Sequence, residues 1–517
     1  MSERDLPPGW VETTLGASIE YGASIKIEPK DIHENDWVLE LEDIESGSSK
    51  LLLRLTFKER KSKSTKNAFN KGDVLYGKLR PYLNKTLIAD QPGYCTTEIL
   101  PLQTSKFIDN RYLYYWLRHP RFLRYAELSS HGMNMPRLGT EAGKSAPFIL
   151  SPLAEQKRIA DKLDLLLGRL DACRAHLDRV PSLLKRFRQA VLAAATSGRL
   201  TQDWREAQRH LVSANMLVEE IIKQRCLRYN RSNINVTKIK NLVRSKPVSH
   251  PLFLIPSTWT WSRWDDLSDW ITYGFTKPMP HFPDGIPVVT AKNRRDGYID
   301  FTNLEYTSNE AFLSLSEKDK PKLGEILITK DGAIRGRAAI VETENLFCIS
   351  QSVAVVRFGG FTGNNKYLLR VIQSQFTQDL INQESAGNAI PHISITNFGR
   401  FPVPLPPLDE QAEIVRRVEA LFGRADRVEA GYQAALARLQ KLQASLLAKA
   451  FRGELVAQDP NDEPAQVLLE RITAQKAATG KPKRERIGTG DAALMVAERV
   501  EAYGVDGGRG RGRPRKG

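Results

Sequence analysis

Two short stretches of the sequence gather Lys and Arg, which contact phosphates and base edges in DNA, and the first of them also contains Tyr and Asn. The first, Lys78 to Lys85, reads Lys-Leu-Arg-Pro-Tyr-Leu-Asn-Lys and closes a region, residues 50–85, in which Lys and Arg far outnumber Asp and Glu. Such residues support binding of a polyanion rather than bond breaking. The predicted DNA-contacting residues of this half of the chain are Lys78, Arg80, Tyr82, Lys85, Asn134 and Arg137.

The second stretch lies in the equivalent part of the second half, around Lys330-Asp331-Gly332, a sequence typical of a turn between strands. For any one cation in these stretches, a solvated charged surface is the simpler interpretation. Because both halves carry cations in the same part, we predict that the two sets face DNA. The predicted DNA-contacting residues of the second half are Lys330, Arg335, Arg337 and His392.

Signatures of catalysis are missing from the sequence. It has no G-x-x-x-x-G-K-[ST] phosphate loop, no H-E-x-x-H and no G-x-S-x-G elbow, and it lacks the Gly-rich cofactor loop and Asn/Asp-Pro-Pro-aromatic motif of a DNA methyltransferase. His131 and His392 have no second ligand at metal-binding spacing. We therefore predict no enzymatic activity, no cofactor and no metal; a self-contained nuclease or methyltransferase is the alternative that these motifs would have supported. The cysteines, Cys95, Cys173, Cys226 and Cys348, lie far apart, which argues against disulfides and zinc.

The elements that must position these residues occur twice. Leu6-Pro7-Pro8-Gly9-Trp10 matches Ile255-Pro256-Ser257-Thr258-Trp259, and the offset between paired residues stays between about 249 and 255 along the chain. We interpret the chain as a duplicated globular region followed each time by a long helix. Further pairs are Gly72-Asp73-Val74-Leu75 with Gly324-Glu325-Ile326-Leu327, both turns entering strands; Asn110-Arg111-Tyr112-Leu113 with Asn365-Lys366-Tyr367-Leu368, both helix starts; Gly132 with Gly387; and Pro136 with Pro391.

A heptad pattern marks the long helix of each half. Both helices begin at a Pro-Leu-x-Glu-Gln sequence and end at Gly198 or Gly453. Apolar residues recur at alternating steps of four and three, which is the seam of a coiled coil, and the simplest partner for each seam is the other copy. For a single stripe, packing or oligomerisation is the alternative. The seam residues are Ile159, Leu163, Leu166, Leu170, Cys173 (interpreted as a small core residue), Leu177, Val180, Leu184, Phe187, Val191 and Ala194, then Ile414, Val418, Leu421, Ala425, Val428, Tyr432, Ala435, Leu439, Leu442 and Leu446.

Length and composition indicate a globular chain of several domains. The 517 residues are 41% hydrophobic and carry a net charge of +16, with no apolar run long enough to span a membrane and no signal peptide. These properties predict a cytoplasmic protein with a polyanionic partner. The predicted domains are residues 1–150 and 255–406 (globular), 151–200 and 407–456 (long helices), 201–254 (a connector with a short helix) and 457–517 (a short helix and a basic, disordered tail).

The Leu-Pro-x-Gly-Trp opening, the Gly-Asp-x-Leu strand, the Pro-Leu-x-Glu-Gln helix start and the Gly-x-Leu helix end, each present twice, are together similar to the DNA-specificity subunit of type I restriction-modification systems. The resemblance spans Leu6 to Val456. It implies an α+β fold in which two target recognition domains are joined by two long antiparallel helices with pseudo-twofold symmetry. Each domain is expected to read one half of a bipartite DNA site, and the helices are expected to set the gap.

The resemblance also implies partners. Family members have no activity alone; they bind two modification subunits, which carry S-adenosylmethionine and methylate adenine, and restriction subunits join that assembly. The expected partners are therefore double-stranded DNA, modification subunits and restriction subunits, with no membrane. The outer faces of the long helices are the expected docking surface. The alternative is a coiled-coil scaffold that binds DNA without sequence preference, which predicts equal affinity for all duplexes and a steep dependence on salt.

Three features depart from the family pattern. Pro181 lies inside the first long helix, where the second copy has Leu436, and it predicts a kink because an interior proline removes a hydrogen bond. Thr258 replaces the Gly of the opening motif in the second copy. The basic tail lies outside the resemblance, and its Arg511-Gly512-Arg513-Pro514 sequence is similar to an AT-hook, a reader of the minor groove.

Overall fold

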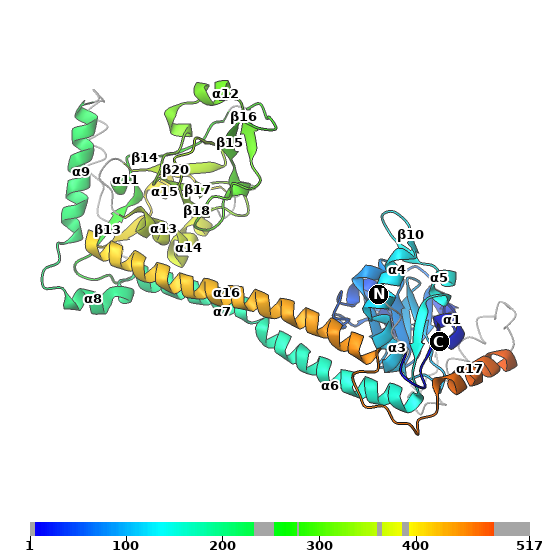
Figure 1. Ribbon diagram of the computed structural model, residues 1–517. Coiled ribbons are helices and arrows are strands. Elements are labelled where there is room, and N and C mark those ends of the chain that lie inside the picture. Colours follow the sequence, from blue (N-terminus) through cyan, green and yellow to red (C-terminus); the bar gives the residue numbers. More distant parts are fainter. Residues whose placement is uncertain (1–5, 232–252, 277–278, 359–363, 385–391, 480–517) are drawn as a thin grey trace, which may run out of the picture. The chain divides into compact units, whose positions relative to one another are not determined.

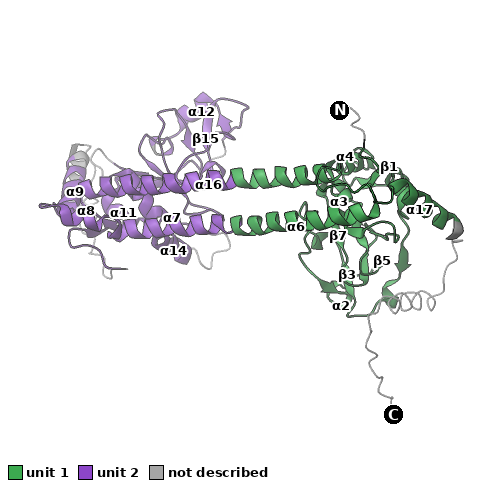
Figure 2. Cartoon of the chain, turned by 60° about the horizontal axis from the view of Figure 1, so that its bottom comes forward, with its two compact units in different colours: residues 1–177, 434–517 green, residues 178–433 purple. Residues whose placement is uncertain are grey.

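The computed structural model describes residues 6–231, 253–276, 279–358, 364–384 and 392–479. The chain divides into two compact units (Figure 2), each of which contains one globular region and parts of both predicted long helices. The fold class is α+β, as predicted. The domain bounds drawn from the sequence stay a prediction. The first unit comprises residues 1–177 and 434–517, and the second comprises residues 178–433.

The first unit is built on two small sheets. A five-stranded sheet has the order β2-β5-β8-β3-β4, in which only β3 and β8 are parallel neighbours, and a three-stranded antiparallel sheet has the order β7-β6-β9. The turn that enters β6 contains Gly72, whose φ of +92° favours glycine. The strands are β2 Ile25–Ile27, β3 Trp37–Leu39, β4 Leu55–Thr56, β5 Lys66–Phe69, β6 Val74–Gly77, β7 Thr86–Ile88, β8 Gly93–Thr96 and β9 Ile99–Leu102.

Aromatic side chains fill the larger core of the first unit. The rings of Tyr112 and Trp116, both on α3, lie 4.9 and 5.0 Å from the ring of Phe451. Phe451 directly follows the last residue of the helix α16 (Leu408–Ala450), so the end of this helix shares a core with the sheet. The helices of this region are α1 Leu15–Ser18, α2 Phe57–Arg60, α3 Asn110–Leu117, α4 Pro120–Leu128 and α5 Thr140–Lys144, and α3 begins at the predicted residue.

The second unit has a four-stranded antiparallel sheet, β14-β20-β17-β18, and a three-stranded sheet, β16-β15-β19, in which β15 and β19 are parallel. Its core gathers around Trp264, Tyr367 and Phe398. The strands are β14 Trp270–Tyr273, β15 Ile286–Val289, β16 Glu305–Thr307, β17 Ile326–Thr329, β18 Ala338–Ile340, β19 Cys348–Ile349 and β20 Val353–Arg357, and the helices are α11 Trp264–Leu267, α12 Asn309–Ser314, α13 Asn365–Gln373, α14 Gln375–Glu384 and α15 Ile395–Gly399.

In each unit a short strand near the opening motif pairs with the strand that leads into a long helix. β1 (Val11–Thr14) is antiparallel to β12 (Pro147–Leu150), with Val11 opposite Leu150. In the second unit β13 (Thr260–Arg263) is antiparallel to β21 (Pro402–Leu405), with Thr260 opposite Leu405. These pairs fix where each long helix leaves its globular region.

The two long helices differ in continuity (Figure 1). The first is interrupted: α6 (Leu153–Leu177) ends, and α7 (Val180–Thr196) begins after two residues in a turn. The second, α16 (Leu408–Ala450), is continuous. Pro181 lies in the first turn of α7, where its missing N–H has no acceptor within the helix. The sequence predicted a kink at this proline; the structure instead has a break, with one helix ending at Leu177 and a new helix starting at Val180.

Burial along these helices is deepest where they pack on the globular regions. Ile159 and Leu163 near the start of α6, and Ile414 near the start of α16, are fully buried. Cys173 is exposed, so its interpretation as a core residue was wrong; residues 171–176 are all exposed and offer no packed surface to it. Val428, another seam position, is 53% exposed. Pairing of the two helices as an antiparallel coiled coil stays a prediction.

Two shorter helices confirm the predicted connector helix and its later echo. They are α9 (Ala214–Arg231) and α17 (Ala465–Thr479); between α7 and α9 lies α8 (Gln202–Ala207). Gly387, Pro391, most of the polar connector and the basic tail lie outside the described residues. Within the described ranges, no helix has the length and apolar character needed to cross a membrane.

Candidate nucleic-acid interface

The loop of residues 78–85 joins β6 to β7 and has an unusual backbone. Pro81–Leu83 form a turn of 3-10 helix, flanked by Arg80 and Asn84 with φ values of 51° and 49°. Non-glycine residues in this left-handed region cost about 1–3 kcal/mol and cluster at functional sites. Tyr82, within the turn, is 53% exposed. The fold thus holds an aromatic side chain at the surface beside the Arg80 cation.

A hairpin from later in the chain lies against this loop. It consists of β10 (Ser130–His131) and β11 (Arg137–Leu138). Leu79 forms a β-bridge with Arg137, the backbone N–H of Arg80 donates to Pro136 O at 2.7 Å, and Arg80 Nη2 donates to Asn134 O at 3.4 Å. The structure therefore brings together the predicted DNA-contacting residues of the first half, Lys78, Arg80, Tyr82, Lys85, Asn134 and Arg137.

Two of these side chains are held by the protein itself. Lys85 Nζ donates to Leu41 O at 2.6 Å, and Arg137 Nε donates to both carboxylate oxygens of Glu98 at 3.1 Å. The Glu98 carboxylate raises the pKa of Arg137. Lys85 and Arg137 therefore brace the loop and the hairpin, whereas the side chains of Arg80, Tyr82 and Asn134 are exposed.

The second unit repeats this arrangement with different side chains. Residues 330–337 join β17 to β18, and Asp331 forms a β-bridge with His392, as Leu79 does with Arg137. Lys330 Nζ lies 2.7 Å from Asp331 Oδ1 and 5.5 Å from the centre of the Tyr273 ring. Arg335 Nη2 donates to Asn382 Oδ1 at 3.0 Å, and Arg337 is exposed. The predicted residues Lys330, Arg335, Arg337 and His392 thus belong to one loop and the segment bridged to it.

The wider basic region of residues 50–85 is not one continuous cationic surface, contrary to the sequence-based expectation. Carboxylates from elsewhere in the sequence pair with several of its cations: Asp90 with Arg54, Glu34 with Lys58, and Asp43 and Glu42 with Arg60. Lys66 is 1% exposed, and its Nζ donates to Glu40 Oε1 at 3.3 Å. Few acids stand within the stretch itself because the acids that pair with these cations lie elsewhere in the sequence.

The repeated Trp and Glu residues form a contact that the sequence analysis did not foresee. Trp10 Nε1 donates to Glu155 Oε2 at 2.8 Å, and Trp259 Nε1 donates to Glu410 Oε2 at 2.9 Å. Each bond ties the opening motif to the first turn of a long helix. The sequence does have Trp and Glu at matching positions of the two copies. That each Trp contacts a Glu could be seen only in the folded structure.

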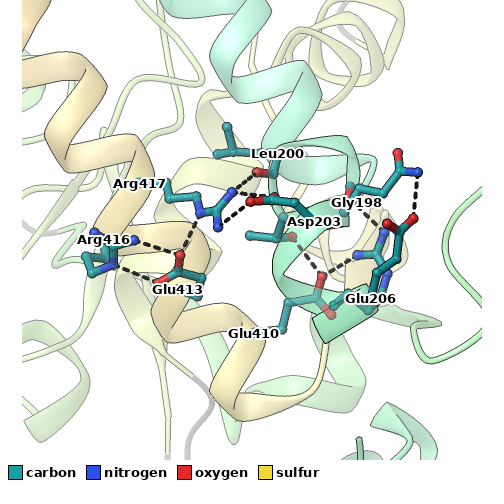
Figure 3. Close-up of polar contacts among 11 residues, drawn as sticks. Gly198, Leu200, Asp203, Glu206, Glu410, Glu413, Arg416 and Arg417 are labelled. Atoms are coloured by element: carbon teal, nitrogen blue, oxygen red, sulfur yellow. Dashed lines mark hydrogen bonds and ion pairs between the residues drawn. The ribbon is translucent and has the colours of Figure 1, made fainter. Parts of the chain in front are cut away.

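The start of α16 carries further polar contacts (Figure 3). Arg417 donates to Leu200 O at 2.9 Å and to Asp203 Oδ1 at 2.6 Å, and its Nε donates to Glu413 Oε1 at 2.6 Å. Arg416 also donates to Glu413, and the two guanidinium groups lower the pKa of Glu413 to about 2. These contacts join α16 to the segment that follows α7 within the second unit.

No grouping of three or more His, Cys, Asp or Glu side chains suited to a metal ion occurs among the described residues. Cys95 and Cys348 are buried free thiols, and burial raises the pKa of each. These cysteines pack as core residues and make no disulfide. The exposed polar and basic residues of the two loops are therefore the groups to which a function is assigned below.

Comparison with known proteins defines the class. The family model of the type I restriction modification DNA specificity domain matches residues 44–175 and again residues 278–438. Together these residues are more than half of the chain. The protein is thus a DNA-recognition subunit, which is not an enzyme by itself. The chain belongs to the family of type I restriction-modification specificity subunits.

Individual relatives support this assignment. The chain is 32% identical over 416 residues to the EcoBI specificity subunit of Escherichia coli, covering 78% of this chain and 80% of the relative. It is 29% identical over 424 residues to the EcoKI specificity subunit of E. coli strain K12, covering 74% and 76%. A chain solved in work on complex assembly and conformational transition of the type I R-M system has a TM-score of 0.63 at 19% identity, covering 87% of this chain and all of that one, which shows a shared fold.

Proposed function

We propose that each globular region reads one half of a bipartite DNA site, that the long helices set the gap between the halves, and that the bound site directs methylation and restriction by partner subunits. The interface in the first half consists of the loop of residues 78–85 and the β10–β11 hairpin. In the second half it consists of the loop of residues 330–337 and the segment at His392.

One observation carries this proposal: the same supporting contacts hold the two loops. Asn110 Nδ2 donates to Gly72 O at 2.9 Å, and Asn365 Nδ2 donates to Gly324 O at 2.6 Å, each at the turn that precedes the strand entering the loop. Asp109 N donates to Gln156 Oε1 and Asn364 N donates to Gln411 Oε1, so the same contact ties each globular region to its long helix. Tyr112 OH donates to Ile149 O and Tyr367 OH donates to Pro404 O, each in the strand that leads into the long helix.

The loops carried by this shared support differ. The first presents Tyr82 on a strained turn, whereas the second presents Arg337 beside the half-buried Arg335. Constant support with variable surface residues is expected of two readers of different sequences, because base contacts depend on the side chains at the interface while the support does not. An internal duplication of one reading unit is the simplest origin of the two halves.

The proposed partners follow from the family. The relatives are named specificity subunits of type I restriction enzymes. We propose that this chain likewise acts with modification subunits, two per chain by the pseudo-twofold repeat, and with restriction subunits, in the cytoplasm. Exposed apolar residues outside the predicted seam, such as Leu165 of α6 and Leu183 of α7 at 51% and 53% exposed, support the long helices as the docking surface.

The competing proposal is a scaffold that binds DNA without sequence preference. The two are distinguished by mapping methylated adenines in cells with and without this chain, in the presence of the modification subunits. A split motif with a fixed gap, present only with this chain, is the result we expect. Methylation that is unchanged in the absence of this chain would show that it is not the reader.

A further inference from the structure

The tip of the β10–β11 hairpin places apolar side chains in water. Met133 is 102% exposed and Met135 is 45% exposed. In Figure 1 the hairpin labelled β10 stands out from the rest of the first unit. No core residue contacts a side chain exposed to this degree, so Met133 contributes nothing to the packing of the unit that carries it.

The hairpin tip has a defined shape. Gly132 has a φ of +115°, and a Cβ at this position would lie 3.0 Å from Met135 O, so the turn requires glycine. The base of the hairpin is held by the pairing of Ser130 with Leu138 and by the double hydrogen bond from Arg137 to Glu98. A braced hairpin with an apolar tip is suited to insertion, because little conformational freedom is lost on binding.

A cation lies directly beside this tip. Arg80 donates through its backbone N–H to Pro136 O and through Nη2 to Asn134 O, so its guanidinium reaches the residue next to Met133. Lys78 is joined to the same hairpin, because its carbonyl accepts from the N–H of Leu138 at 3.0 Å. An apolar tip with an Arg beside it matches a stacked base step flanked by phosphates.

We propose that Met133 is a wedge that enters a groove of duplex DNA and inserts between two base pairs of the half-site read by the first unit. This proposal rests on the proposed function and adds a mode of reading to it. Apolar wedges, methionine among them, partly unstack base steps and kink the duplex, and the cost of unstacking depends on the sequence of the step. The first half-site would then be selected partly by its deformability.

DNA suits this surface better than a protein partner. A methionine surface that docks a protein needs a contiguous apolar area, whereas Met133 and Met135 share their tip with Asn134 and border Arg80. The polar and cationic neighbours would be poorly matched in an apolar protein interface. They are the residue types that contact base edges and phosphates.

The test uses the full chain with its modification subunits and a duplex that carries the motif found by methylation mapping. 2-Aminopurine is placed in turn at each step of the first half-site, and its fluorescence reports unstacking. We expect a rise at one step with the natural chain, no rise with Met133→Ala, and an affinity about 10- to 100-fold lower for that variant. Met133→Leu, which keeps an apolar wedge, should retain the rise.

Two controls separate the outcomes. Met216→Ala alters an exposed methionine of α9 in the second unit and should change neither fluorescence nor affinity. Met133→Ala should leave the salt dependence of binding unchanged, whereas Arg80→Ala should reduce its slope by about one.

Specific binding without unstacking, or a Met133→Ala variant that binds DNA normally but loses its modification subunits, overturns the wedge alone. Absence of any specific binding overturns the proposed function.

Discussion

Arg205 Nη1 lies 2.5 Å from Oε1 of the buried Glu410, and this ion pair secures the start of α16 in the second unit. Thr201 Oγ1 donates to the same oxygen at 2.8 Å. The equivalent Glu155 of the first unit has neither partner, and its buried Oε1 has no hydrogen bond among the described residues. The residues in the places of Thr201 and Arg205, at the sequence offset of the helix repeat, are Val456 and Pro460.

This difference predicts opposite effects of one substitution at the two sites. Glu410→Gln should destabilise the second unit by about 1–3 kcal/mol, because it leaves Arg205 without its counter-charge. Glu155→Gln should leave the first unit unchanged or stabilise it near pH 8, because it removes an unpaired buried charge and keeps an acceptor for Trp10. Hydrogen exchange of the β1–β12 and β13–β21 strand pairs measures each unit separately. Equal losses in both variants would contradict this account.

The same site gives a dependence on pH. Burial raises the pKa of Glu155, with opposing contributions from Trp10 and Arg158. A raised carboxyl pKa in the folded state means that its contribution to stability is fully present below the ordinary value of 4.5 and is lost as pH rises through the folded pKa. Protection of the β1–β12 pair should therefore fall as pH rises from about 4.5. Glu155→Gln should abolish this fall, and its persistence in that variant would assign it to another group.

His119 predicts the opposite slope in the first unit. Its ring stacks on Trp116 at 5.1 Å, its Nδ1 accepts from Arg121 N at 3.2 Å, and burial with the charges of Arg121 and Arg452 lowers its pKa to about 4. Because the unfolded chain binds this proton near pH 6.5, stability should fall between pH 6.5 and about 4, by roughly 1–3 kcal/mol. His119→Asn keeps an acceptor at the start of α4 and does not titrate. Thermal melting of both proteins across this range is the check; identical pH profiles would exclude His119 as the cause.

Single cations in the two loops predict separate losses of DNA binding. Arg80→Ala and Arg337→Ala should each weaken binding of the mapped duplex by about 5- to 100-fold and reduce the salt slope by about one, because each removes one exposed cation from the proposed interface. Arg438→Ala, which removes an exposed cation of α16, is the matched control. Titration at several salt concentrations decides the point. If Arg438→Ala weakened DNA binding as much as Arg80→Ala, a scaffold that binds DNA without sequence preference would be favoured.

Much of the fold could be predicted because local sequence determines it. The turn at Gly72 needs a left-handed residue, the helix starts at Asn110 and Asn365 have local caps, and Pro181 interrupts its helix by its own geometry. The sequence also pointed to the two loops, because their strands and turns are repeated. Residues 78–85 and 330–337 do join paired strands.

Long-range contacts were beyond the sequence analysis. Lys66 appeared to be a surface cation, but its side chain is buried and paired with Glu40 from another strand end. Cys173 occupies a seam position, but its side chain is exposed, because burial depends on which residues lie opposite a side chain. Each error arose because a periodic or compositional pattern does not name the partner of a side chain.

The central claim is that each unit reads half of a site and that the helices set the gap. The most direct test deletes one heptad from each helix, residues 171–177 and residues 428–434. In each of these stretches, all residues except one are exposed. Each deletion shortens its helix by about 10 Å, equal to about three base pairs. Methylation mapping in cells that carry this variant should show both half-sites unchanged and a gap shorter by about three base pairs. An unchanged gap with retained methylation would contradict the account.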